Sequence, residues 1–346
     1  MKRIFGNTAG LKPNQIRRLE NLYRRRTPPE CLVTPELARD VSQPSHDAAT
    51  GVAPQGAAAG VFKYVRGPDG PIALAATGPG ELTLVRVVER TSLMGDTTRE
   101  EARTVLPVSG VKGEVTSLAL DVRGQEIFAG TSAGEIVRFD LRDEANPKQE
   151  EAVVAAAGSA VTVLGFLNGD RTLVSGDAAG GVSSWQVVQA EEGDSRRLMR
   201  IYAFRPHGAA VTGFSASRRD KGFVTGDAAG GVEVHYATTG KSLLSLRAGT
   251  APLGAVVFAP KADAVLAVAT DGRLHQFALR NPHPEVTWRS MFGKVWYEGY
   301  ARPDYVWQST GGTDDFEAKF SLTPLIYGTL KGTFYALILA IPIALA

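Results

Sequence analysis

The chain has 346 residues, of which 44% are hydrophobic and 21% charged, and this composition excludes a wholly disordered protein. Lys and Arg number 38 against 36 Asp and Glu, a net charge of +2 that is too balanced for a dedicated nucleic-acid binder. The single cysteine, Cys31, excludes an intrachain disulfide and a multi-cysteine metal site. The 38 glycines and 19 prolines predict many turns and favour an all-β fold.

The N-terminal residues 1–26 are strongly basic, with eight Lys and Arg against one acidic residue, Glu20. Apolar residues at helical spacing predict a short basic amphipathic helix within residues 13–26. This helix is either a solvated N-terminal helix or a cytoplasmic segment next to a membrane, where basic residues accumulate. Residues 27–59 are rich in Pro, Ala, Ser, Asp and Gly and predict a flexible linker. No apolar stretch follows the basic segment, so no secretory signal is predicted.

The middle of the chain contains a repeat. Residues 160–187 and 210–237 share the heptapeptide GDAAGGV, and residues 72–87, 115–141 and 254–279 follow the same pattern more loosely. The glycine before the last predicted strand aligns the five copies at spacings of 54, 46, 50 and 42 residues, at Gly80, Gly134, Gly180, Gly230 and Gly272. Such periods are typical of the blades of a β-propeller. A sixth copy before residue 72 or after residue 279 is left open.

Each copy has the same internal order: an alternating apolar run, a polar turn, a second apolar run, a Gly-rich turn and a third run. The residue five positions beyond the aligned glycine is expected to pack between neighbouring sheets, where a large ring buries most area. These residues are Val85, Phe139, Trp185, His235 and Phe277. A histidine at this position predicts a structural side chain, so we interpret His235 as part of the core.

The third runs GEIVRFD and GGVSSWQ, at Gly134–Asp140 and Gly180–Gln186, resemble the closing strand of WD40 repeats. The segment PHGAAVTGFSAS resembles the opening of such a repeat, with His207 at the position of its histidine. The family's Trp-Asp pair is intact in none of the five copies. The resemblance implies a WD40-like β-propeller over residues 60–284, without the family's side-chain relay in every blade.

We predict no catalytic, cofactor-binding or metal-binding residue. The GDAAGG turns offer backbone N–H groups to an anion, but a phosphate loop needs Lys and Ser or Thr at the start of a helix, and here a strand follows. The five histidines are scattered without metal-ligand spacing. Asp314, Asp315 and Glu317 form an acidic cluster that we interpret as a solvated junction.

The C-terminal residues 322–346 contain one charge, Lys331, in 25 residues. A bilayer core needs about 20 predominantly apolar residues in a helix, so this segment predicts a transmembrane helix, with Pro342 tolerated inside it. The alternative is a terminal helix buried in a soluble protein. Because the apolar run reaches the last residue, we expect the chain to be part of a longer protein.

Residues 285–321 precede this helix and are rich in aromatic residues. Trp and Tyr favour the membrane–water interface, and Phe292, Trp296 and Tyr300 at four-residue spacing predict a short interfacial helix. The alternative is aromatic packing under the propeller, and the two can coexist.

The segment from His283 to Ala346, including VWYEGYARPDYVWQS and SLTPLIYGTLKGTFYALILAIPIAL, resembles the membrane-entry region of phosphate-type ABC transporter permeases of the PstC kind. LKPNQIRRLENLYRRR, at Leu11–Arg26, resembles the cytoplasmic start of the same family. This resemblance implies the N-terminal part of a permease subunit in the bacterial inner membrane, importing phosphate or a related anion, with the propeller as a periplasmic interaction platform. The first membrane helix that the family carries after the basic segment is absent here.

The implied partners are a second permease subunit, an ATP-binding cassette ATPase and a periplasmic anion-binding protein. Because transport is not chemistry on a substrate, no enzymatic activity and no cofactor are expected. The alternative function is a soluble WD40-like scaffold for protein–protein interaction, whose apolar terminal helix packs against the ring.

Overall fold

A computed structural model describes residues 61–78, 80–91, 97–143, 146–189, 195–313 and 316–345. The basic helix predicted within residues 1–26 and the linker predicted at 27–59 lie outside these residues. Everything described belongs to one compact unit, Pro54–Ala346. Its elements are almost all antiparallel strands, followed by one long C-terminal helix.

Five antiparallel meanders make up the repeat region, one for each predicted copy. Sheet 1 comprises β1 (Phe62–Gly67), β2 (Gly70–Gly78), β3 (Glu81–Thr91) and β4 (Thr97–Pro107). Sheet 2 comprises β5 (Val115–Leu120), β6 (Glu126–Thr131), β7 (Glu135–Asp140) and β8 (Lys148–Val154). Sheet 3 comprises β9 (Val161–Phe166), β10 (Thr172–Asp177), β11 (Val182–Gln189) and β12 (Arg196–Ala203). Sheet 4 comprises β13 (Val211–Ala216), β14 (Gly222–Asp227), β15 (Gly231–Tyr236) and β16 (Lys241–Arg247). Sheet 5 has three strands, β17 (Leu253–Phe258), β18 (Ala264–Ala269) and β19 (Leu274–Ala278).

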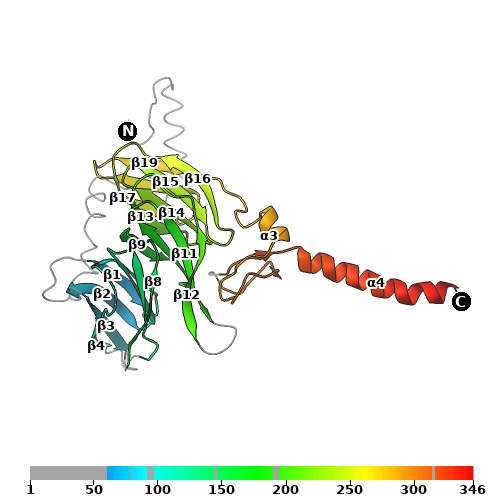
Figure 1. The fold of residues 1–346 in the computed structure, drawn as a ribbon, viewed down its shortest axis with the longest axis horizontal. Coiled ribbons are helices and arrows are strands. Elements are labelled where there is room, and N and C mark those ends of the chain that lie inside the picture. Colours follow the sequence, from blue (N-terminus) through cyan, green and yellow to red (C-terminus); the bar gives the residue numbers. More distant parts are fainter. Residues whose placement is uncertain are drawn as a thin grey trace, which may run out of the picture. The chain divides into compact units, whose positions relative to one another are not determined.

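Consecutive sheets pack face to face through their first strands, as the blades of a propeller do (Figure 1). Apolar clusters fill the spaces between sheets 1 and 2, 2 and 3, 3 and 4, and 4 and 5. A repeated threonine joins the first strands. The Oγ1 atoms of Thr116, Thr162 and Thr212 donate to the carbonyls of Val161, Val211 and Leu253 in the next sheet, at 2.7, 2.6 and 2.7 Å. The fold is therefore a WD40-like β-propeller, as the repeats predict.

The backbone conformation of the turns explains why the five aligned positions are glycine. All five have positive φ, between 71° and 90°, which L side chains rarely adopt. At Gly180 an added Cβ would also stand 2.5 Å from the carbonyl oxygen of His207 in the next connection. In the same turn, Oδ1 of Asp177 accepts hydrogen bonds from the N–H groups of Ala179 and Gly181, at 2.8 and 3.0 Å. The GDAAGG segments are thus turns closed by their own aspartate.

The position five residues beyond each glycine is a core position. Phe139, Trp185 and His235 are fully buried there, and Phe277 is half-buried against sheet 4. The three-run pattern of the sequence leaves out the outer strands β4, β8, β12 and β16. Their described residues are mostly exposed or half-buried, as in KQEEAVV of β8, and so give a weak apolar signal.

The chain continues through α3 (Trp288–Phe292), a two-stranded sheet of β20 (Trp307–Gln308) and β21 (Lys319–Phe320), and α4 (Thr323–Leu345). The helix expected from Phe292 to Tyr300 is wrong, because α3 ends at Phe292 and Gly293 follows in extended backbone. Val295 instead pairs with Asp304 in an isolated bridge. We call residues 285–321 the connector.

Candidate functional site: the junction between the propeller and the terminal helix

A buried ion pair attaches the connector to the propeller. Nζ of Lys221, in the turn before β14, lies 2.7 Å from Oε2 of Glu298 in the connector and donates to the carbonyl of Asn168 at 2.6 Å. Thr172, at the start of β10, donates to the other oxygen of Glu298 at 2.7 Å. The Lys221 and Glu298 side chains are only 2% and 6% exposed. The connector is therefore held across sheets 3 and 4 by hydrogen-bonded charges that are shielded from water.

A second connector carboxylate lies in the same junction. Glu317 accepts a hydrogen bond from the Thr238 hydroxyl and another from the backbone N–H of Glu298, the latter at 2.9 Å. Burial, reinforced by the nearby Glu298 carboxylate, raises the pKa of Glu317 above its usual range. The interpretation of Glu317 as a solvated residue is therefore wrong. Asp314 and Asp315, the other members of that predicted cluster, lie outside the described residues.

Aromatic side chains complete the junction and divide into two groups. Tyr297 is buried, and burial raises its pKa to about 12. The backbone N–H of Trp296 donates to the Tyr202 hydroxyl of β12 at 3.5 Å. By contrast, Trp288 is 78% exposed and stacks on the exposed Phe292 with ring centroids 5.5 Å apart. The alternative of aromatic packing against the propeller therefore holds for the buried group, whereas Trp288 and Phe292 leave an exposed aromatic surface beside it.

The root of α4 is part of the same junction. Just before the helix, the N–H of Leu322 donates to the Met291 carbonyl of α3 at 2.7 Å, and the N–H of Ser321 donates to the Val306 carbonyl at 3.0 Å. Ser321 is fully buried, whereas α4 itself contains no buried residue across its 23 described residues. The sequence alternative of a terminal helix packed against the ring is not what the structure shows.

In the part of the chain that the structure describes, α4 is the one helix that is both long enough and apolar enough to span a membrane. Its 23 residues extend about 35 Å at 1.5 Å per residue, against a bilayer core of about 30 Å. Its one charged residue, Lys331, lies in the first half, where a long side chain reaches toward the interface.

Sheet 4 contains a buried polar relay. Nδ1 of His207 lies 3.0 Å from Oδ2 of Asp227, and its Nε2 lies 2.7 Å from the Thr225 hydroxyl. That hydroxyl lies 3.0 Å from Nε2 of His235, whose Nδ1 lies 3.0 Å from the Ser242 hydroxyl. His207 thus occupies the position that the resemblance implies, and His235 stands where sheet 3 has Trp185, which donates to Ser175 at 2.8 Å. His207, Thr225, Asp227 and His235 are buried and Ser242 is half-buried, and we interpret the relay as structural.

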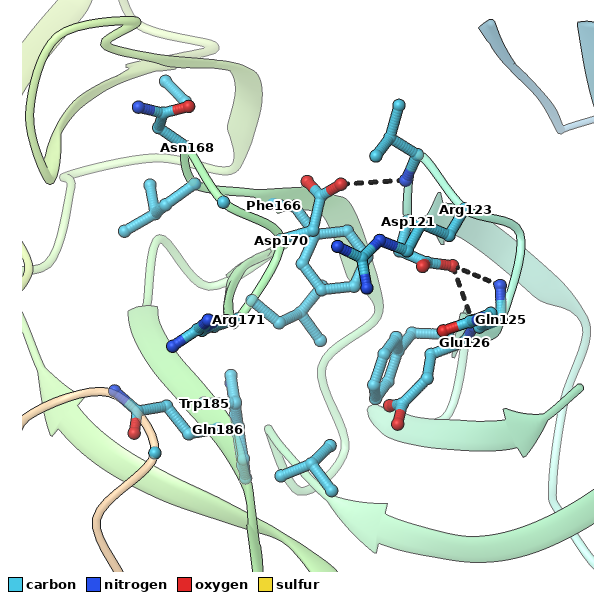
Figure 2. Close-up of a pocket in the computed structure, with 18 of the residues that line it drawn as sticks. Asp121, Arg123, Gln125, Glu126, Phe166, Asn168, Asp170, Arg171, Trp185 and Gln186 are labelled. Carbon is cyan, nitrogen blue, oxygen red and sulfur yellow. Dashed lines mark hydrogen bonds between the residues drawn. The ribbon is translucent and has the colours of Figure 1, made fainter. Parts of the chain in front are cut away.

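A cleft of about 1020 Å³ opens between sheets 2 and 3 at the end where the first two strands of each sheet turn (Figure 2). Phe166 and Trp185 belong to its apolar lining, and Gly299 of the connector reaches its edge. Two carboxylates of the lining already accept hydrogen bonds from the backbone. Asp170 accepts one from the N–H of Val122 at 2.8 Å, and Asp121 accepts two from the N–H groups of Gln125 and Glu126. Burial raises the pKa of Asp170.

The lining of this cleft includes three arginines in equivalent turns, and one of them, Arg123, acts electrostatically on the Asp170 carboxylate. Arg123, Arg171 and Arg218 come from equivalent turns of sheets 2, 3 and 4 and are exposed. Within the described residues, their guanidinium groups form no hydrogen bond or ion pair. The cleft therefore presents cations around an apolar floor, a combination that suits an acidic peptide segment.

No family model matches the chain, and no curated protein matches it. Among solved structures, the β-propeller domain of Cps50 (Swd1) from Myceliophteria thermophila is similar at 14% identity, over 63% of this chain and 83% of its own, with a TM-score of 0.46. A chain of the Mitotic Checkpoint Complex is similar at 15% identity over 62% of this chain and 61% of its own, with a TM-score of 0.47. The computationally designed Ika4 protein is similar at 23% identity over 50% of this chain and 95% of its own, with a TM-score of 0.41. These likenesses concern the fold alone.

Proposed function

We propose that the chain is a membrane-anchored interaction platform, in which α4 lies in lipid and the propeller binds protein partners beside the membrane. One observation carries the proposal: an apolar helix without a buried residue emerges directly from a junction that is itself buried and ion-paired to the propeller. A soluble protein gains nothing by exposing such a surface to water. The tight junction makes the propeller and the root of the helix a single mechanical unit.

More specifically, the chain is the N-terminal part of a permease subunit of an ABC importer for phosphate or a related anion. The support is the resemblance of residues 283–346 and 11–26 to permeases of the PstC kind. On this proposal α4 is the first helix of the permease core in the bacterial inner membrane, and the propeller lies on the periplasmic side. The partners are a second permease subunit, an ATP-binding cassette ATPase and a periplasmic anion-binding protein.

The cleft between sheets 2 and 3 is the surface that this platform offers to a partner. Three of its exposed arginines lie at one end of the sheets, which is also where the connector attaches through Lys221 and Glu298. A partner that binds there contacts the propeller on the side where the chain leaves for the membrane. Carboxylates of the partner pair with the guanidinium groups while apolar side chains cover the floor of the cleft.

Co-purification tests the permease proposal. The tagged full chain is co-expressed with the second permease subunit, the ATPase and the anion-binding protein of a phosphate importer, extracted in mild detergent and isolated by its tag. We expect the second permease subunit to co-elute in a stable ratio. A chain that needs detergent for extraction but retains none of the three proteins would contradict the permease proposal and leave the membrane-anchored platform standing.

The same preparation tests the cleft. Reversing Arg123, Arg171 and Arg218 to Glu is expected to remove the partner bound by the propeller. The matched control reverses three arginines that are also exposed but lie outside the cleft, Arg103, Arg197 and Arg247. Equal loss with both sets of substitutions would show a general charge effect and eliminate the cleft as the binding surface.

A further inference from the structure

Three large aromatic side chains of the connector are exposed. Trp288 and Phe292 belong to α3 and are 78% and 43% exposed, and Trp307 belongs to β20 and is 41% exposed. We call these three residues the collar. The two rings of α3 stack with their centroids 5.5 Å apart, so they form one continuous apolar surface. Such a surface is typical of a site that contacts another molecule or a membrane.

The collar is attached to the root of α4. The N–H of Leu322, the residue before the helix, donates to the carbonyl of Met291 in α3 at 2.7 Å. The N–H of Ser321 donates at 3.0 Å to the carbonyl of Val306, the residue before β20. Each acceptor is directly followed in the chain by a collar residue. The exposed rings are therefore held beside the point where the apolar helix begins.

The single charge of α4 sets the depth of this root in a bilayer. Lys331 is eight residues beyond Thr323, which is about 12 Å along the helix axis. A lysine in a membrane helix extends its ammonium toward the nearer interface. The headgroup region is about 5–7 Å thick on each side of the apolar core. With α4 in lipid, the first turn of the helix and the collar beside it therefore lie in the headgroup region.

The charges of the connector are sorted in the same direction. The carboxylates of Glu298 and Glu317 are buried at the propeller, where they meet Lys221 and Thr238. Within residues 288–308, three cations are exposed against one carboxylate, namely Arg289, Lys294 and Arg302 against Asp304. Anionic lipid headgroups attract exposed Lys and Arg next to a membrane helix. These cations distinguish a lipid surface from an uncharged apolar partner.

We propose that the collar lies in the headgroup region of the membrane that holds α4, with its rings at the interface and the neighbouring cations on anionic lipids. Tryptophan favours this region because its ring has an apolar body and a polar N–H. The inference rests on the proposed function, since it needs α4 in lipid, and it adds a second membrane contact. Because the connector is ion-paired to the propeller through Lys221 and Glu298, this contact fixes the tilt of the propeller on the membrane.

Quenching of tryptophan fluorescence by brominated lipids tests this contact on the full chain in vesicles of phosphatidylcholine and phosphatidylglycerol. Bromines just below the headgroups are expected to quench Trp288 and Trp307, so Trp288→Phe should lose a large part of the quenched emission. Trp296→Phe is the matched control. Trp296 belongs to the same connector but is half-buried, with its Nε1 donating to the Tyr300 carbonyl at 2.8 Å, and its removal should leave the quenched emission unchanged.

A second pair of variants tests the cations. Replacing Arg289 and Lys294 together by Glu should reduce the quenching of Trp288 in vesicles that contain phosphatidylglycerol and leave it unchanged in phosphatidylcholine alone. Equal quenching of the parent and the variant in both kinds of vesicle would overturn the role of anionic lipids. Val154→Trp, on β8 of the propeller and at a position that is 58% exposed, should not be quenched. Its quenching would show unspecific contact of the propeller with lipid and overturn the proposal.

A probe inside α4 separates the collar from the anchor. Phe334→Trp places a fluorophore about 17 Å along the helix, where bromines near the bilayer centre should quench it. Quenching of this probe without quenching of Trp288 would overturn the collar and leave the membrane anchor standing. No quenching at either position would overturn the proposed function as well. Loss of Trp288 quenching on co-reconstitution with the second permease subunit would show that a protein covers the collar, which would also overturn the proposal.

Discussion

At the scale of single residues, the propeller is held by a few side chains that recur from sheet to sheet. The threonine in the first strands of sheets 2, 3 and 4 is the clearest case, because its hydroxyl bridges to a backbone carbonyl of the next sheet. A buried carbonyl that loses this donor keeps its desolvation cost without the compensating bond. These hydroxyls therefore hold neighbouring sheets together, and each also has a longer bond to a glycine carbonyl of its own sheet, at 3.1, 3.3 and 3.4 Å.

Thr162→Val removes the bond to the Val211 carbonyl, and the longer one to Gly176, while preserving the shape of the side chain. We expect the free energy of unfolding to fall by about 1 kcal/mol, the usual net value of a neutral hydrogen bond. Thr162→Ser keeps the hydroxyl and should lose clearly less. Urea unfolding of the detergent-solubilised chain measures both. If the serine variant were as destabilised as the valine variant, the methyl group and not the hydrogen bond would account for the loss.

His235 gives the propeller a dependence on pH. Burial, followed by the charges of His207 and Arg205, lowers the pKa of His235 to about 3 in the folded chain, whereas an unfolded histidine titrates near 6.5. The unfolded state therefore binds a proton first, and stability falls as the pH drops from about 6.5 toward 3.

Between pH 7 and pH 5 this histidine should cost about 2 kcal/mol of unfolding free energy. His235→Gln does not titrate, so the variant is expected to lose that much less over the same interval, whatever its stability at pH 7. The measurement is urea unfolding of both proteins at the two pH values. Identical losses in both would show that His235 is not the titrating group.

At the scale of elements, the repeated turns and first strands were predictable and the connector contacts were not. Gly134, Gly180 and Gly230 recur because a turn needs positive φ where the next connection passes close by, and such a need leaves a periodic sequence signal. Lys221 and Glu298 are 77 residues apart, and neither lies in a pattern that points to the other. The sequence alone favours a solvated Glu317, because acidic residues usually lie in water. Only the folded junction provides Thr238 and the Glu298 N–H as its donors.

The Lys221–Glu298 pair is the element-scale test of the junction. Lys221→Met leaves the Glu298 carboxylate buried without its cation, and we expect a loss of about 3 kcal/mol or more. The double variant Lys221→Met/Glu298→Leu should be milder than the sum of the single ones, because it leaves no unpaired charge. Unfolding measurements on the two single variants and the double variant form the double-mutant cycle. Limited proteolysis of the connector provides a second readout. Strict additivity would mean that the two side chains act independently.

At the scale of the whole molecule, five meanders and one apolar helix without a buried residue support the proposed platform with a lipid anchor. The sequence predicted the propeller, because blade repeats are visible in a single chain. It also predicted the apolar terminal helix from its uncharged run. It did not predict how the two are joined, since the junction is built from single residues of sheets 3 and 4 and the connector.

The central claim, that α4 lies in lipid, is tested most directly by alkaline carbonate extraction of membranes from cells that express the full chain. We predict that the protein stays in the membrane pellet. A variant with Leu337→Arg and Ile338→Arg should shift to the supernatant, because each arginine at the centre of a membrane helix costs about 2.5–3.5 kcal/mol on insertion scales. Release of the unmodified chain by carbonate, with its propeller still folded, would contradict the account.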